Sequence, residues 1–152
     1  MMVVFFNKQG IVISVMLPGQ KTVTSSGYTK TCLTLFFEVF LNRRPISRLS
    51  FWSLHHENAL YAHRAGATTG YLTVAGIKVL EYSPYRPGLA PCDFGLFPYI
   101  NTCMKDRKFS TEKQPIAAFE EELDLVPRQK WEDWIDDWFM RMLKCINNQG
   151  LL

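Results

Sequence analysis

The sequence predicts an α/β domain with a helical C-terminal tail. Three features lead to this prediction: paired β-branched runs at the start, a strand–helix–strand order in the middle, and tryptophans at helical spacing near the end. The 152 residues are 47% hydrophobic and 20% charged, which suits one compact domain with a single core. We expect residues 1–110 to form that core and residues 111–152 to form a helical tail of the same domain.

The first half of the chain is expected to alternate strands and helices. The expected elements are a β-hairpin of residues 2–6 and 11–17 with a turn at 7–10, a buried helix over 28–44, a strand over 49–55, a helix over 63–75 and a strand over 78–82. Because the last three run strand, helix, strand, they predict a parallel βαβ unit.

The second half begins with a rigid loop. Residues 83–91 contain three prolines and a glycine, which remove backbone donors and restrict φ, so regular structure is not expected there. A helix starting at Pro91 carries Asp93, Leu96, Phe97 and Ile100. A final helix is indicated by an apolar stripe, which we interpret as core packing: Trp131, Trp134, Ile135, Trp138, Phe139, Met142, Leu143 and Ile146.

Several classes of protein are disfavoured by the sequence. The apolar residues 1–17 are interrupted at 7–10 and lack a cleavage site, so neither a secretory nor a membrane-spanning segment is expected. The four cysteines form no CxxC pair, which favours buried free thiols over zinc or disulfides. His55, His56 and His63 do not form HExxH, since Leu60 occupies the required position, so a zinc hydrolase is disfavoured.

The charge is unevenly distributed along the chain. Residues 1–110 hold 12 basic and 5 acidic residues, a net of +7, whereas residues 111–137 hold 3 basic and 9 acidic residues, a net of −6. A basic lobe of this kind would attract the phosphates of DNA. Ordinary surface charge followed by an acidic helical tail explains the same distribution equally well.

Three stretches together resemble the mariner transposase family. Residues 54–59 (Leu-His-His-Glu-Asn-Ala), followed by His63, are similar to a family element that ends a strand. Residues 85–98 (Tyr-Arg-Pro-Gly-Leu-Ala-Pro-Cys-Asp-Phe-Gly-Leu-Phe-Pro) resemble a long family signature, and residues 138–150 contain its closing Arg, Lys-Cys and Gly. Weaker matches at residues 17–23 and 42–45 lie in the right order between them. The resemblance covers almost the whole chain.

The resemblance implies an RNase H-like mixed sheet with flanking helices and an activity of metal-dependent DNA cleavage and strand transfer. In the family, three carboxylates hold two Mg²⁺ or Mn²⁺ ions that activate the nucleophile and stabilise the leaving oxygen. By the resemblance, Asp93 corresponds to the third carboxylate and Glu57 stands in the place of the second. The first carboxylate, its central strand and the DNA-binding helix-turn-helix arm have no counterpart in these residues.

We therefore expect a degenerate metal site and no catalysis. Glu57 has a longer side chain than aspartate, and the segment between Glu57 and Asp93 is one residue longer than in the family, while an octahedral Mg²⁺ site tolerates little change. Gly88 also replaces the usual aspartate of the loop. Taken alone, Asp93 would more simply be read as a charge in the first turn of its helix.

The resemblance also implies partners. We expect a nuclear protein, with no membrane contact, that binds transposon-end DNA through basic residues: Arg43, Arg44, Arg64, Arg86 and Lys78. Without the central strand the neighbouring sheet edges are exposed, so we expect marginal stability, self-association or pairing with full-length transposase. The alternative is a host-retained module that binds DNA or transposase without catalysis, and membership in a methyltransferase–transposase fusion is a third interpretation.

Overall fold

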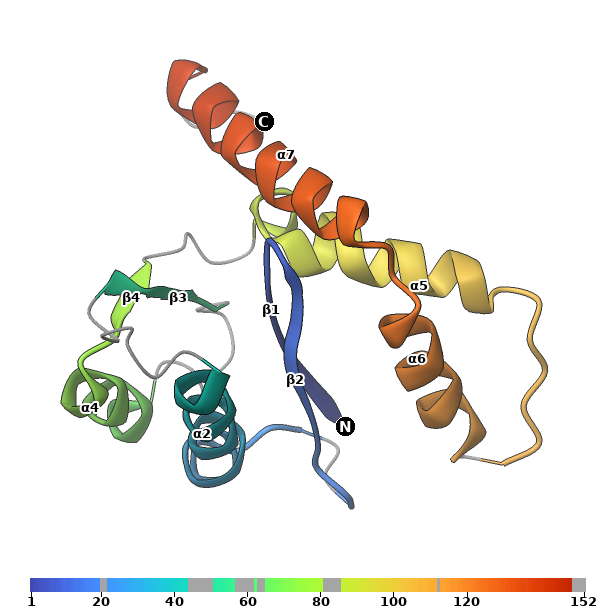
Figure 1. The fold of residues 1–152 in the computed structure, drawn as a ribbon, viewed down its shortest axis with the longest axis horizontal. Coiled ribbons are helices and arrows are strands. Elements are labelled where there is room, and N and C mark those ends of the chain that lie inside the picture. Colours follow the sequence, from blue (N-terminus) through green and yellow to red (C-terminus); the bar gives the residue numbers. More distant parts are fainter. Residues whose placement is uncertain are drawn as a thin grey trace. The chain divides into compact units, whose positions relative to one another are not determined.

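The structure is a computed structural model that describes residues 1–19, 22–43, 51–56, 62, 65–80, 86–111 and 113–148. The chain divides into two compact units, drawn in Figure 1. Unit 1 contains Met1–Phe6 and Ile11–Tyr85, and unit 2 contains Asn7–Gly10 and Arg86–Leu152.

The chain opens with the expected β-hairpin. Strands β1 (Met2–Asn7) and β2 (Gly10–Met16) pair with each other, and a connection of two residues allows only an antiparallel arrangement. The turn is held by the Asn7 side chain, whose Oδ1 accepts a hydrogen bond from the Gln9 amide at 2.7 Å. Gly10 follows with φ of 126°, a conformation that disfavours any residue with a side chain.

A long helical segment follows the hairpin, as predicted. It consists of α1 (Ser25–Gly27), a π-helical stretch η1 (Tyr28–Leu33) and α2 (Thr34–Arg43). Thr24 caps its start, since its hydroxyl accepts a hydrogen bond from the Gly27 amide at 3.0 Å. The buried face presents Leu33, Phe36, Phe37 and Phe40, the i, i+3, i+4, i+7 pattern of one helical face.

A parallel strand pair completes the elements of unit 1. Strand β3 (Ser53–His55) pairs with β4 (Lys78–Leu80) in register Leu54 to Val79, and α4 (Gly66–Ala75) connects them. The βαβ prediction is therefore confirmed. Phe51 and Trp52 precede β3 without joining it, so the strand is shorter than expected within the described residues.

The described strands form two separate two-stranded sheets, β1–β2 and β3–β4. Aromatic contacts hold the helices of unit 1 to the strands and to each other. Phe5 of β1 stacks on Phe36 of α2 with ring centroids 4.6 Å apart, and Phe37 of α2 stacks on Tyr71 of α4 at 6.0 Å, so α2 lies beside α4 (Figure 1). These contacts form the hydrophobic core of unit 1.

Unit 2 is mainly helical. The expected proline-rich loop contains one turn of 3₁₀ helix, η3 (Pro87–Leu89), which corrects the prediction that it has no regular structure; Pro87 has the φ that a first helical position needs. The helix predicted from Pro91 begins as a π-helical stretch, η4 (Cys92–Leu96), and continues as α5 (Phe97–Met104). The tail then forms α6 (Gln114–Asp124) and α7 (Arg128–Asn147).

Helix α7 packs closely on η4. A Cβ added to Gly95 would lie 2.7 Å from the Trp134 ring, so only glycine permits this approach. Trp134 is itself fixed by Tyr99 at 5.6 Å and by Trp131 at 5.2 Å, both edge to face. Trp131 and Trp138 are buried, which confirms core packing for the first part of the stripe. Phe139, Leu143 and Ile146 are more than half exposed, so the interpretation is wrong for the last turns of α7.

The cysteines differ from the prediction of buried thiols. None of the four forms a disulfide, but only Cys32 is buried, Cys92 and Cys145 are half-buried, and Cys103 is exposed. Among the described helices, none is long and apolar enough to cross a membrane.

Candidate functional site

Asp93 lies in the first turn of η4, directly after the proline-rich segment. Its backbone amide donates to the carbonyl of Ala90 at 2.9 Å, which begins the helix immediately after Pro91. The side chain is half-buried, and burial raises the pKa of Asp93 above its ordinary value because the charged form loses hydration. A nearby cation, such as a metal ion, would stabilise the charged form of a carboxyl in this setting.

The segment that carries Asp93 is fastened to α7 by Arg141. The guanidinium of Arg141 lies 4.1 Å from the centre of the Phe94 ring, and its Nη1 donates to the carbonyl oxygen of Gly88 at 3.3 Å. Its Nε donates to Asp137 one turn earlier at 2.7 Å. Because Phe94 follows Asp93 directly, Arg141 helps to fix the backbone on which Asp93 stands. Sequence analysis matched Arg141 to a motif but assigned it no role.

In unit 1, His55 ends strand β3 and His56 follows it directly. His55 is half-buried, and burial lowers its pKa to about 4, so the ring is neutral at physiological pH. The Nδ1 of His56 lies 3.2 Å from the Oη of Tyr28. Tyr28 is buried, and desolvation raises its pKa far above the ordinary value, so the phenol is neutral and serves as a hydrogen-bonding group.

The residues predicted to contact DNA have different surroundings. Arg43 is the last residue of α2 and is exposed, with its Nη1 3.5 Å from the carbonyl oxygen of Ile11. Lys78 is the first residue of β4 and is also exposed. Arg86 is half-buried and its Nη1 donates to the Sγ of Cys145 on α7 at 3.5 Å, so it joins the loop to that helix. Arg44 and Arg64 lie outside the described residues, as does Glu57.

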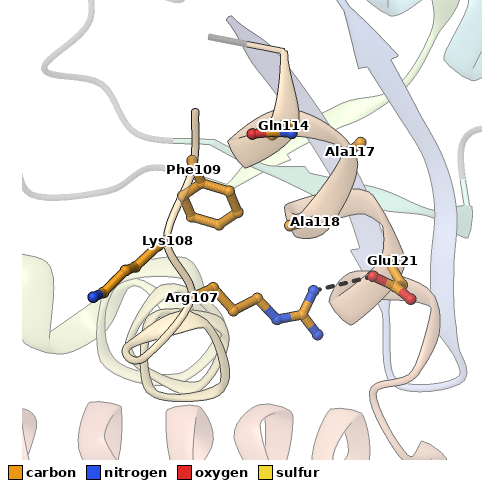
Figure 2. A pocket seen from close by; sticks show the side chains of 7 residues that line it. All are labelled: Arg107, Lys108, Phe109, Gln114, Ala117, Ala118 and Glu121. Carbon is orange, nitrogen blue, oxygen red and sulfur yellow. Dashed lines mark hydrogen bonds and ion pairs between the residues drawn. The ribbon is translucent and has the colours of Figure 1, made fainter. Parts of the chain in front are cut away.

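A pocket that the sequence did not indicate lies between the chain after α5 and helix α6, within unit 2 (Figure 2). Arg107 lines it and pairs with two carboxylates, with Glu121 at 3.0 Å and with Glu122. The hydrogen bond to Glu121 raises the pKa of Arg107. The Phe109 ring and the methyl groups of α6 form the apolar part of the lining, while Lys108 points away from the helix. Its ion pairs make this pocket a structural junction between α5 and α6.

A metal centre needs several ligands that converge. Within the described ranges, no three His, Cys, Asp or Glu side chains lie close enough together to hold a metal ion. Asp93, described at the start of η4, is therefore not part of a complete ligand set there, and the residues described do not fit a two-metal centre. Glu57, the second expected ligand, lies outside those ranges.

Known proteins resemble this chain along nearly all its length, although no family model matches it. The human histone-lysine N-methyltransferase SETMAR is 24% identical over 158 aligned residues, which cover 99% of this chain and 22% of that protein. The mariner Mos1 transposase of Drosophila mauritiana is 22% identical over 140 residues, 91% of this chain and 36% of that protein. The chain thus spans about a fifth and about a third of these relatives.

Solved structures agree with these relatives. The catalytic domain of Mos1 mariner transposase superposes with a TM-score of 0.87 at 22% identity, covering 99% of this chain and 74% of that one. This chain has the fold of the mariner transposase catalytic domain. A pre-cleavage Mos1 transpososome gives a TM-score of 0.88 at 23% identity over 99% of this chain and 44% of that one. The resemblance to the mariner family and the RNase H-like α/β class are therefore confirmed.

Structures of the Mos1 catalytic domain have been determined with Mn and with Mg. Other Mos1 structures are paired-end complexes, one of them with the left transposon end. Divalent metal and DNA are thus partners of the structural relative.

Proposed function

We propose that this chain descends from a mariner-type transposase and that its 152 residues contact DNA in the nucleus without cleaving it. The observation that carries the proposal is the match in fold over nearly the whole chain, combined with the position of Asp93 at the start of η4. The ancestral reaction is metal-dependent cleavage and strand transfer of transposon-end DNA. The pairing of DNA ends in the Mos1 complexes supports DNA as the partner.

We propose the absence of cleavage from the carboxylates that are available as metal ligands. Phosphodiester exchange by two metal ions needs carboxylates that bring both ions to one phosphate, and electrostatic stabilisation is usually the largest catalytic contribution. The resemblance supplies only Asp93 and a glutamate, Glu57, in place of an aspartate. Any Mg²⁺ or Mn²⁺ held by two carboxylates of unequal length would lack the charge and geometry for the reaction.

The test is a nicking assay with a labelled duplex that carries a mariner transposon end, run with Mg²⁺ and with Mn²⁺. We expect no nicks from the wild-type chain, and the same result from Asp93→Ala and Glu57→Ala. Nicking that disappears in Asp93→Ala would show that the site is catalytic and would overturn the proposal. Glu57→Asp is a further variant for the same nicking assay. Cleavage restored by this change alone would show that the glutamate was the sole defect of the site.

A second candidate is a host-retained module that binds DNA or a full-length transposase. The net charge of +7 in residues 1–110 favours it, because phosphate contacts release counterions and make binding sensitive to salt. Binding to duplex DNA should weaken steeply between about 50 and 200 mM salt, and Arg43→Ala and Lys78→Ala should each reduce the salt slope by roughly one. No binding at low salt would exclude a DNA-binding role.

The likeness to SETMAR supports a third arrangement, in which these residues are part of a methyltransferase–transposase fusion. Reading the genomic frame upstream of Met1 tests it. A continuous frame encoding a methyltransferase domain supports the fusion, and an in-frame strand carrying an additional carboxylate would reopen catalysis.

A further inference from the structure

Several threonines of the described helices use their hydroxyl groups inside the fold. The hydroxyl of Thr73 donates to the carbonyl oxygen of Thr69 at 2.8 Å, and that of Thr102 donates to Pro98 at 2.8 Å. A hydroxyl bonded to its own helix is held within the fold. Ser110, in the connection between α5 and α6, differs in this respect.

Ser110 is held in place by its backbone and not by its hydroxyl. Its amide donates to the Oε1 of Gln114 at 2.6 Å, and the amide of Thr111 donates to the same oxygen at 3.2 Å. Within the described part of the chain, the Ser110 hydroxyl takes part in no hydrogen bond. A group attached to this hydroxyl would therefore break no hydrogen bond that the fold uses.

The residues around Ser110 are accessible to another protein. Residues 105–111 are all exposed, and residues 107–109 form neither helix nor strand. Lys108, two residues before Ser110, is directed away from α6 (Figure 2). An exposed and irregular segment can enter the cleft of an enzyme without the unfolding of either flanking helix.

Three of the five residues before Ser110 are basic: Lys105, Arg107 and Lys108. Neither lysine forms an ion pair with a described residue, so their charges are available to a partner. Kinases select their substrates by charge pattern, and those with an acidic cleft accept a serine that follows basic residues closely. We propose that Ser110 is a phosphorylation site for a serine/threonine kinase of this class, which we call a basic-directed kinase.

The reaction is a phosphoryl transfer from ATP. The Oγ of Ser110 bonds to the γ-phosphorus, the bond from this phosphorus to the bridging oxygen breaks, ADP leaves, and the hydroxyl proton passes to the catalytic base of the kinase. The product carries a charge of about −1.5 to −2 at neutral pH. Because the fold uses the Ser110 amide and not its hydroxyl, the melting temperature of the modified chain should stay within about 2 °C of that of the unmodified chain.

The fold restricts the recognition of one basic residue, Arg107. Its guanidinium pairs with Glu121 at 3.0 Å and with Glu122, so a kinase has to replace these partners before it can bind the side chain. The exchange costs little, since the side chains of Arg107 and Glu121 are 37% and 64% exposed. Glu121→Gln weakens this competition, so it should raise kcat/KM for phosphorylation about two- to fivefold.

The experiment incubates the full chain with γ-labelled ATP and a basic-directed kinase, and mass spectrometry locates the phosphate. We expect a single phosphate per chain, on Ser110, and none in Ser110→Ala. Thr111→Ala is the matched control, because Thr111 is the adjacent exposed hydroxyl, and it should be phosphorylated as the wild type is. No incorporation in the wild type, or incorporation that persists in Ser110→Ala, would overturn the proposal. This inference does not depend on the proposed relation to DNA.

Further variants test how the kinase recognises the segment. Lys108→Ala and Arg107→Ala should each lower kcat/KM about tenfold or more, whereas Lys113→Ala, on the other side of the serine, should change it little. Circular dichroism melts confirm that each variant is folded.

A peptide of residues 103–113 separates recognition from access. Its kcat/KM should be comparable to that of the Glu121→Gln chain, because the peptide lacks the carboxylates of α6 that compete for Arg107. Phosphorylation of the peptide but not of the folded chain would refute the accessibility of the segment. A Glu121→Gln chain that is phosphorylated more slowly than the wild type would contradict the role assigned to the Arg107 ion pairs.

Discussion

Replacing Gly95 with alanine should destabilise the chain, although alanine is the better helix former. The ideal Cβ at this position would lie 2.7, 2.8 and 3.0 Å from three atoms of the Trp134 indole. These distances are well inside ordinary van der Waals contact, so the ring or the backbone has to move. The indole has little freedom to do so, because Tyr99 and Trp131 pack against it edge to face.

Two opposing effects set the change in the free energy of unfolding that Gly95→Ala causes. Removing glycine from a helix interior gains about 1 kcal/mol, while inserting a methylene into a packed site costs about 1–3 kcal/mol and occasionally more. Here the cost lies at the upper end, since the obstructing atoms belong to a fixed ring, so we expect a net loss of about 1–2 kcal/mol. Gly70→Ala is the matched control: Gly70 lies inside α4 with no atom within 4 Å of its added Cβ, and it should gain about 0.5–1 kcal/mol.

Urea unfolding followed by circular dichroism measures both variants. A double-mutant cycle with Trp134→Leu isolates the clash, because a smaller side chain at 134 leaves room for the added methyl group. In that background Gly95→Ala should become neutral or stabilising. If it costs the same with leucine as with tryptophan, the loss does not arise from the indole and the packing argument is refuted.

The other predictions concern charged and titrating groups. Arg141→Ala should destabilise the chain by about 1–2 kcal/mol through loss of the contacts with Phe94 and Gly88. Arg141→Lys should retain less than half of the stability that these contacts contribute. Urea titrations compare the variants, and equal stabilities of Arg141→Lys and the wild type would exclude the stacking contact. Burial lowers the pKa of His55 from 6.5 to about 4, so between these pH values the unfolded chain binds a proton at this residue more readily than the folded chain does. The free energy of unfolding should therefore fall as the pH falls from 6.5 towards 4, and it should fall less steeply in His55→Gln. An unchanged dependence of stability on pH in this variant would refute the assignment. Asp93 acts in the opposite direction: burial raises its pKa above 3.8, so its charging destabilises the fold as the pH rises through that value, and Asp93→Asn should abolish this component of the pH profile. Arg107→Ala should lower the melting temperature only slightly despite two carboxylate partners, because exposed ion pairs contribute little to stability; a large loss of melting temperature would contradict this.

The sequence predicted those elements whose local signals agree with their tertiary surroundings. The hairpin was marked by a turn sequence between β-branched runs, and α7 by an apolar stripe with consistent spacing. Strand β3 was predicted too long because apolar residues such as Phe51 resemble strand residues, yet Phe51 is 82% exposed and outside the sheet. Periodicity reports which residues are apolar, but strand ends depend on pairing partners elsewhere in the chain.

The candidate site was predicted in part. Asp93 was found because a long signature surrounds it, and its place at the start of a helix was confirmed. The contacts of Arg141 with Phe94 and Gly88 join residues about fifty positions apart, and no local pattern encodes such a pair. The DNA contact of Arg86 stays a prediction, and the structure adds a contact that the sequence did not indicate, from its Nη1 to the Sγ of Cys145. Charge in a sequence identifies a cation but not the group that it faces.

Several residues of the signature around Asp93 stabilise the fold of unit 2. Gly95 is required by Trp134, Phe94 lies under Arg141, and Pro87 begins a 3₁₀ turn, so much of the motif serves folding. Selection for stability alone would therefore preserve these residues in a chain that had lost catalysis. Asp93 differs from its neighbours, because burial of its carboxyl disfavours the charged form and an asparagine would fit the same space. A gain in stability at neutral pH in Asp93→Asn would mean that the aspartate is kept at a cost to the fold, which is what a binding role, and not packing, requires.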